Sequence, residues 1–223
     1  LFSNTTGFNN TAVGYIAMYN NTTGWWNTAV GYSAFSSGTA YMNSSGFGYD
    51  AEPGGTNRIM IGNSAVTWIG GYSIWNNLSD ARVKNDVKED VKGLDFILNL
   101  RPVTYYFDKD KMDELIGTKD DLEYPEKYEV ETIRQSGFLA QEVEKAALNA
   151  GYDFNGVTAP KGDVKYYTLG YAAFVVPLVK SVQELNIKNI DLEDQLNDLQ
   201  KKYVELLDLI KQQNTKIQKL ENK

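Results

Sequence analysis

The sequence predicts a mixed fold in three parts, which form a homotrimer. The parts are a β-solenoid-like repeat over residues 1–78, a small α+β unit over residues 79–169, and a long α-helical coiled coil over residues 170–223. Three observations predict this division. Residues 1–78 repeat at a short fixed interval and carry almost no charge, the middle alternates short apolar stretches with turns, and the last part has a heptad pattern.

The N-terminal part is an internal repeat. Residues 4–15 align with residues 21–32 at an offset of 17, and a third, degenerate copy keeps Gly, Tyr and Ala at that interval: Gly14, Gly31 and Gly48; Tyr15, Tyr32 and Tyr49; Ala17, Ala34 and Ala51. Such a period is typical of a solenoid, in which Gly permits left-handed corners and Asn and Thr side chains satisfy turn backbone groups. The alternative is a disordered polar linker, but linkers rarely keep Val, Tyr and Trp in register.

The middle part is expected to alternate short helices and strands. We expect a short helix around residues 94–100, strands at 103–107 and 133–139, and a helix at 141–148 with Val143, Ala146 and Ala147 inward. Residues 109–131 include 13 charged residues out of 23 and predict a solvated excursion. Tyr166 and Tyr167 are expected to end a third strand, with Thr168 capping the next element.

The C-terminal part has apolar residues spaced alternately by three and four. Twelve of its fourteen seam positions are apolar: Val175, Val182, Asn189, Leu196, Tyr203, Ile210 and Ile217 at a, and Leu178, Leu185, Leu192, Leu199, Leu206, Gln213 and Leu220 at d. A helix of this length would extend roughly 70 Å, too far to be buried on one small domain. Its partner helices are therefore expected from other copies of the chain. Heptad rules alone leave dimer and trimer open, and the repeat favours the trimer.

Composition excludes several function classes. The chain has no Cys and no His, so it has no disulfide, no thiolate nucleophile, no imidazole base and no Cys or His metal ligand. We expect no cofactor and no metal ion. A net charge of −7 repels phosphate backbones, so we expect no nucleic-acid partner. No stretch is apolar enough for a membrane span. Because the sequence begins with Leu1 instead of Met, we expect it to be a fragment of a longer protein.

Three blocks in the middle part resemble a known family. They are residues 79–84 (SDARVK), 93–107 (GLDFILNLRPVTYYF) and 137–146 (GFLAQEVEKA), followed by a tyrosine-containing strand and the coiled coil. Together they resemble the intramolecular chaperone auto-processing domain that ends endosialidase tailspikes and many phage tail fibres. The NTAVGY blocks of the repeat resemble the heads of trimeric adhesins and tail-fibre-like proteins. The resemblance implies a phage tail fibre or tailspike, or an extracellular surface fibre of a bacterium.

The resemblance also implies the chemistry. In that family, three copies assemble, guide folding of the preceding β-structured part, and then cut themselves off at the Ser of the SD motif. Carried over, Ser79 is the nucleophile, Lys84 is the general base, and Leu78-Ser79 is the scissile bond of a serine peptidase that turns over once in cis. Asp80 and Arg82 are candidate supporting residues, more readily explained as a helix cap and a structural ion pair. Val83 stands where the motif commonly has Leu, a mild departure.

Two other functions remain open at this point. The same domain is able to act without cleavage, as a trimerisation module of a structural fibre or surface adhesin. An aromatic-rich tip is able to bind a host-surface glycan, since Trp25 and Trp26 offer rings that stack on sugars. Such residues more often line the core of a repeat. Gln141 and Glu142 are candidates for trimer contacts or for orienting the Ser79 and Lys84 pair, and we expect a structural role for them.

Overall fold

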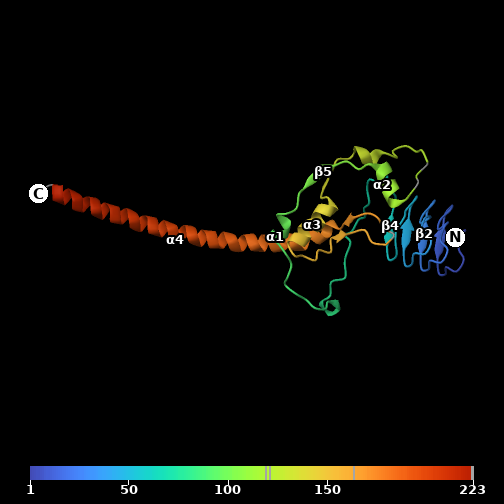
Figure 1. Ribbon diagram of the computed structural model, residues 1–223, viewed down its shortest axis with the longest axis horizontal. Helices are drawn as coiled ribbons and strands as arrows, with labels where there is room; N and C mark the ends of the chain where they lie inside the picture. The colour runs from blue at the N-terminus through green and yellow to red at the C-terminus, as the bar shows by residue number, and fades with distance from the viewer. Residues whose placement is uncertain (119, 121, 163, 222–223) are drawn as a thin grey trace. The chain divides into compact units, whose positions relative to one another are not determined.

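The computed structural model describes residues 1–118, 120, 122–162 and 164–221, which form two compact units (Figure 1). Unit 1 contains residues 1–87, 100–145 and 154–170, and unit 2 contains residues 88–99, 146–153 and 171–223. The division into a repeat, a chaperone part and a coiled coil follows sequence pattern instead, and it stays a prediction.

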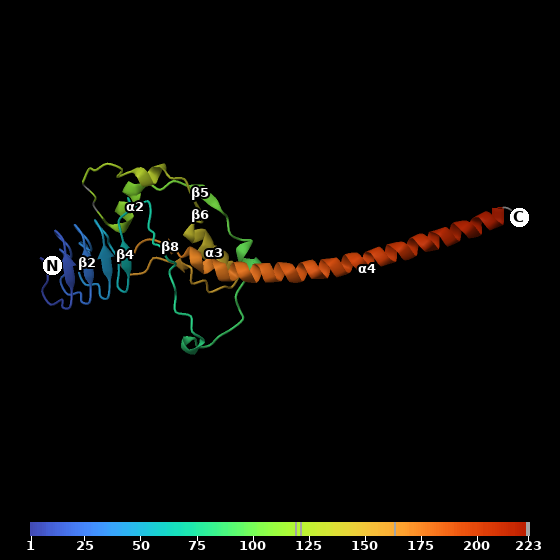
Figure 2. The same cartoon turned by 180° about the vertical axis from the view of Figure 1, so that it is seen from behind.

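A four-stranded parallel sheet with strand order β1-β2-β3-β4 organises the N-terminal repeat. Its strands are β1 (Thr11–Val13), β2 (Thr28–Val30), β3 (Ser45–Phe47) and β4 (Ile59–Ile61). Thr11 lies opposite Thr28, and Thr28 opposite Ser45, so the 17-residue interval of the sequence is the register of the sheet. The last pairing, Phe47 opposite Ile61, shortens this interval to 14 residues. Figures 1 and 2 show the strands following one another in chain order.

The interior of the repeat is small and partly polar. Its apolar residues form one cluster: Ala17, Met18, Ala29, Ala34 and Phe35. Buried polar side chains, among them the amides of Asn21 and Asn27, lie beside this cluster, and Asn27 illustrates their role. It donates from its side chain to the Tyr41 carbonyl at 2.7 Å and accepts from the Ser44 amide at 3.0 Å. The expected satisfaction of turn groups by Asn side chains is thus confirmed at this position.

Aromatic side chains one interval apart also stack on one another. The ring centroids of Phe8 and Trp25 lie 5.8 Å apart, and those of Tyr15 and Tyr32 lie 5.4 Å apart. Such offset contacts between rings stabilise the succession of strands beyond simple burial.

The rest of unit 1 contains short elements. β5 (Val103–Tyr105) and β6 (Gln135–Gly137) pair antiparallel, within the two expected strands. The expected solvated excursion is wrong in part, because it contains helix α2 (Lys109–Ile116) and the 3-10 turn η2 (Glu129–Thr132), and because Lys109 and Lys127 are buried. Asp108 caps α2 by accepting from the Lys111 amide at 3.0 Å. Lys119 and Asp121 lie outside the described residues.

A second antiparallel pair, β7 (Val157–Thr158) with β8 (Thr168–Leu169), corrects another prediction. Tyr166 and Tyr167 precede strand β8 instead of ending a strand, and Thr168 lies in the strand instead of capping a helix. Helix α3 (Ala140–Asn149) agrees with the expected helix, and its Val143, Ala146 and Ala147 are buried as expected.

Unit 2 packs short helix α1 (Leu94–Ile97) against the start of helix α4 (Val175–Glu221), which comes directly after the 3-10 turn η3 (Tyr171–Phe174). Phe96 is the centre of this contact, with its ring 5.4 Å from Tyr152 and 6.2 Å from Phe174. Glu184 on α4 accepts a hydrogen bond from the Leu94 amide at 2.8 Å, which satisfies a free donor at the start of α1.

Helix α4 is 47 residues long and confirms the long C-terminal helix. Pro177 lies in its first turn, where its missing amide breaks no helical hydrogen bond. From Leu185 to Leu220 the helix is solvent-exposed, and its seam side chains are uncovered in the single chain: Leu192 is 60% exposed and Leu199 is 64% exposed. No helix among the described residues has the length and apolar character that crossing a membrane requires.

Candidate functional site

A tight turn positions the SD motif. Residues Ala81–Val83 form the 3-10 turn η1, and Asp80 caps it by accepting from the Arg82 backbone amide at 2.9 Å. At the other end, the Lys84 amide donates to the Ala81 carbonyl at 3.1 Å. The turn reverses the chain between Ser79 and Lys84, which brings two residues five positions apart to the same side.

Ser79 and Lys84 are in direct contact. Lys84 Nζ donates a hydrogen bond to Ser79 Oγ at 2.7 Å. Both residues are exposed in the single chain, and the neighbouring Leu78 is 82% exposed. The pair expected from the resemblance is therefore brought together, beside an accessible Leu78-Ser79 peptide bond.

Asp80 and Arg82 form an ion pair beside this contact. Arg82 Nη2 lies 2.6 Å from Asp80 Oδ2, and Arg82 Nε donates to both carboxylate oxygens at 3.0 and 3.1 Å. These hydrogen bonds hold the pKa of Asp80 below its usual range and raise the pKa of Arg82. Cap and ion pair are both present as expected, and both groups stabilise the turn without contacting Ser79 or Lys84 in any described hydrogen bond.

Glu142 is engaged elsewhere. Its carboxylate accepts two hydrogen bonds from Arg101, at 2.5 and 3.0 Å. The Arg101 guanidinium lowers the pKa of Glu142. This bidentate pair joins α3 to the segment before β5, which fits the structural role expected for Glu142.

A buried charge cluster, unforeseen in the sequence, ties α2 to the repeat. Lys109 Nζ contacts Asp113 at 2.6 Å and Asp120 at 3.0 Å, and its side chain is fully buried. Asp120 also accepts from the Tyr49 hydroxyl at 2.5 Å and from the Tyr124 hydroxyl at 2.9 Å. In the sequence, the one indication of this cluster was the spacing of Lys109 and Asp113, which are four residues apart and would face each other on a helix.

Electrostatics within this cluster favour charged forms. Burial alone would lower the pKa of Lys109, but hydrogen bonds to Asp113 and Asp120 outweigh it and raise that pKa. Burial would likewise raise the pKa of Asp120, but donors from Tyr49, Lys109 and Tyr124 outweigh it and lower that pKa. Together the pair is held as ammonium and carboxylate.

The two tryptophans differ in exposure. Trp25 is half-buried and stacks on Phe8, whereas Trp26 is 58% exposed and meets Trp25 edge-on, with ring centroids 6.4 Å apart. For metals, the described residues hold no group of three or more carboxylates arranged to bind an ion.

Comparison with known proteins identifies the middle segment. Residues 79–152 match the protein-family model described as chaperone of endosialidase. This match supports an intramolecular chaperone domain of the endosialidase type and a chaperone role for that segment. Neither a curated protein nor a solved structure matches the chain.

Proposed function

We propose that residues 79–223 trimerise, guide folding of the β-rich repeat, and then release it by cutting the Leu78-Ser79 bond. One observation carries this proposal: Lys84 Nζ lies 2.7 Å from Ser79 Oγ, and Ser79 is part of the Leu78-Ser79 peptide bond. The match to the endosialidase chaperone family begins at residue 79, at the proposed cut.

The reaction is an acyl transfer followed by hydrolysis. Neutral Lys84 removes the proton from Ser79 Oγ, and this oxygen attacks the carbonyl carbon of Leu78. The Ser79 nitrogen leaves with the proton returned by Lys84, and Leu78 is then held as an ester on Ser79 Oγ. Water cleaves the ester, which yields a Leu78 carboxylate and a free Ser79 amine. The nucleophile is attached to its own substrate, so little entropy is lost in aligning the two.

Assembly is the proposed trigger. In the single chain Lys84 is exposed and its ammonium donates to the hydroxyl, whereas a base must first lose its proton. Transfer to a less solvated site favours the neutral amine of a lysine. Burial of the Ser79 and Lys84 pair between three chains would therefore start cleavage only after the trimer has formed.

The trimer itself rests on two features. The seam of α4 is exposed for most of its length, and each strand of the repeat leaves an apolar outward residue exposed, such as Val13 at 56% and Ile61 at 45%. We interpret the in-register parallel ladder as successive coils of a β-solenoid and α4 as one strand of a three-stranded coiled coil. Such a protein suits a phage tail fibre, a tailspike, or a surface fibre of a bacterium.

Mass spectrometry of freshly purified protein tests the cleavage. Fragments of 78 and 145 residues are expected from the natural sequence, and only the intact 223-residue chain from Ser79→Ala. Intact chains from both proteins would favour the alternative, a trimerisation module that does not cut.

The exposed ring of Trp26 favours a second, additional function: binding of a host-surface glycan at the repeat. A glycan array probed with the full chain and with Trp26→Ala tests it. Binding lost in Trp26→Ala but kept in Phe2→Ala, which removes another exposed ring, is the expected result. Equal signals from the three proteins would contradict it.

A further inference from the structure

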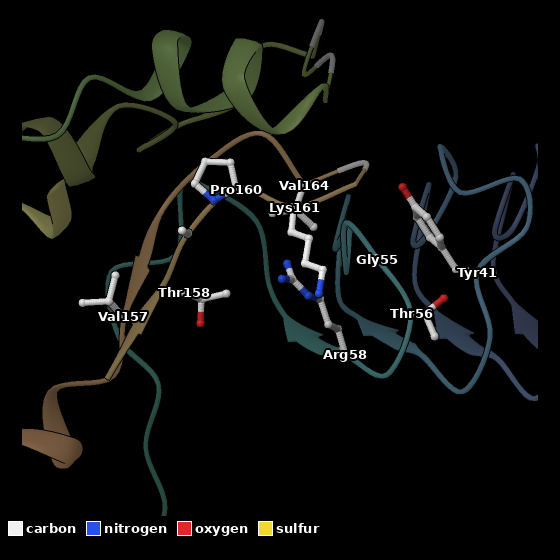
Figure 3. A pocket seen from close by; sticks show the side chains of 10 residues that line it. Tyr41, Gly55, Thr56, Arg58, Val157, Thr158, Pro160, Lys161 and Val164 are labelled. Carbon is white, nitrogen blue, oxygen red and sulfur yellow. The ribbon is translucent and has the colours of Figure 1, made fainter. Parts of the chain in front are cut away.

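An open pocket of about 620 Å³ in unit 1 is lined by two segments far apart in the sequence. One segment, residues 41–58, contains β3 and the turn before β4, and the other, residues 157–161 with Val164, contains β7 and part of the loop after it. Figure 3 shows the side chains of Arg58 and Lys161 converging in this space, one from each segment.

These two cations bring positive charge into one pocket of an acidic chain. Arg58 is the only Lys or Arg in residues 1–78. Among the residues that the structure describes, which leave out Asp163, no carboxylate forms an ion pair with Arg58 or Lys161. Some of the other cations are in ion pairs with carboxylates, among them Lys109, Lys111, Arg82 and Arg101.

A tight loop and small or polar residues surround the two cations. Backbone hydrogen bonds between Lys161 and Val164, at 3.0 and 3.2 Å, close a tight loop at the pocket. Gly55 lies beside the guanidinium, and a Cβ there would be in ordinary contact with Arg58 Nε at 3.5 Å and close to Val164 at 3.3 Å. The hydroxyls of Thr56 and Thr158 also line the pocket and offer further donors.

We propose that this pocket binds a multiply charged oxyanion, of which inorganic phosphate is the simplest. Two like charges that line one concavity repel each other, and an anion between them removes that repulsion. A planar guanidinium donates two parallel hydrogen bonds to a tetrahedral oxyanion, and an ammonium adds a point charge.

The site also bears on the proposed cleavage, and this step rests on that proposal. Arg58 precedes the Leu78-Ser79 bond and Lys161 lies after it, so the two cations end on different products. An anion held by both would bridge the products and keep the chaperone part on the repeat after the bond is cut.

Calorimetric titration of the full-length Ser79→Ala chain with phosphate, at constant ionic strength and pH 7, tests the site without requiring cleavage. Arg58→Gln and Lys161→Gln are each expected to weaken phosphate at least tenfold. Lys165→Gln, which removes a charge from the same loop outside the pocket, is expected to leave it unchanged. Equal affinity in all four proteins, or acetate binding as tightly as phosphate, would overturn the assignment.

Bridging is tested separately on the cleaved natural sequence. With a tag on residue 223, capture of the 145-residue product is expected to retain the 78-residue product longer in phosphate than in chloride of equal ionic strength. This difference should vanish in Arg58→Gln. Retention that ignores phosphate would refute bridging, whereas absence of any cut product would refute the cleavage proposal and leave the titration to decide on the site.

Discussion

At the scale of single residues, substitutions of Lys84 test whether this lysine, which donates a hydrogen bond to Ser79, acts as the base or only supports the structure. Lys84→Ala and Lys84→Arg are both expected to stop cleavage, because a guanidinium stays protonated and cannot accept the hydroxyl proton. Lys88→Ala, four residues on, is the matched control and should cut at the natural rate. Mass spectrometry over time measures all three. Cleavage of Lys84→Ala at the natural rate would remove Lys84 from the mechanism.

Lys109 is the residue on which the buried charge cluster depends. Replacing it by Met leaves Asp113 and Asp120 buried without their cation, which should lower the free energy of unfolding by about 3 kcal/mol. Lys111→Met, on the same helix but at an exposed ion pair with Asp108, should change it little. Urea unfolding of both variants in the Ser79→Ala background gives the comparison. Equal effects would mean that the cluster does not hold unit 1 together.

Sequence reasoning found some of these residues and missed others for a physical reason. Asp80 was recognisable as a cap because capping depends on local spacing. Burial of Lys109 was not recognisable, because it depends on Asp120, beyond the end of helix α2, and on Tyr49, far earlier in the chain. A dense run of charge normally predicts a solvated segment, and only tertiary contacts override that expectation.

At the scale of elements, the glycine corners of the repeat set how closely the strands stack. Gly31 has φ +138°, and a Cβ there would lie 2.4 Å from the Gly48 carbonyl oxygen. Since backbone cannot move aside as a side chain can, Gly31→Ala should destabilise the repeat by about 2 kcal/mol or more. Gly71→Ala, where the nearest atom is 4.0 Å away, is the control. Thermal unfolding followed by circular dichroism should show a lower midpoint only for Gly31→Ala.

The regular elements were predictable from sequence where periodicity was strong. The 17-residue interval by itself predicts the pairing of β1, β2 and β3, since identical residues in register repeat identical contacts. Strand β4 breaks the interval, and no repeated motif marks it. Strand β8 was misplaced because two tyrosines favour a strand by propensity, whereas cross-strand partners decide where it begins.

At the scale of the whole molecule, the exposed seam of α4 makes the oligomeric state testable. Sedimentation equilibrium at micromolar concentration should give a trimer for Ser79→Ala. Leu192→Asp with Leu199→Asp places charge at two seam positions and should yield monomers. Asn197→Asp with Lys201→Asp adds charge to the same helix outside the seam and should remain trimeric. A trimer from the seam variant would show that α4 does not assemble the chain.

The pH dependence of folding stability distinguishes two sets of buried carboxyls in unit 1. The pKa of Asp120 is lowered, so its contribution is present above the ordinary Asp value of about 3.9 and is lost as pH falls. Lys109, whose pKa is raised, contributes to folding stability up to its ordinary pKa of about 10.4, and this contribution is lost at higher pH. The cluster should therefore be strongest between these limits.

Asp50 and Glu52 act in the opposite direction. Burial raises the pKa of both, by more than the serine hydrogen bonds to them lower it, so the folded chain binds these protons more tightly than the unfolded chain. Their contribution is present at low pH and is lost as pH rises. Relative to the natural residue, Glu52→Gln should gain stability from pH 4 to 7, whereas Asp120→Asn should lose stability as pH rises from 2 to 4 and then stay level. Unfolding midpoints at pH 2, 4, 5.5 and 7 in the Ser79→Ala background measure both trends. Parallel trends in the two variants would contradict this assignment, because opposite shifts in pKa require opposite slopes.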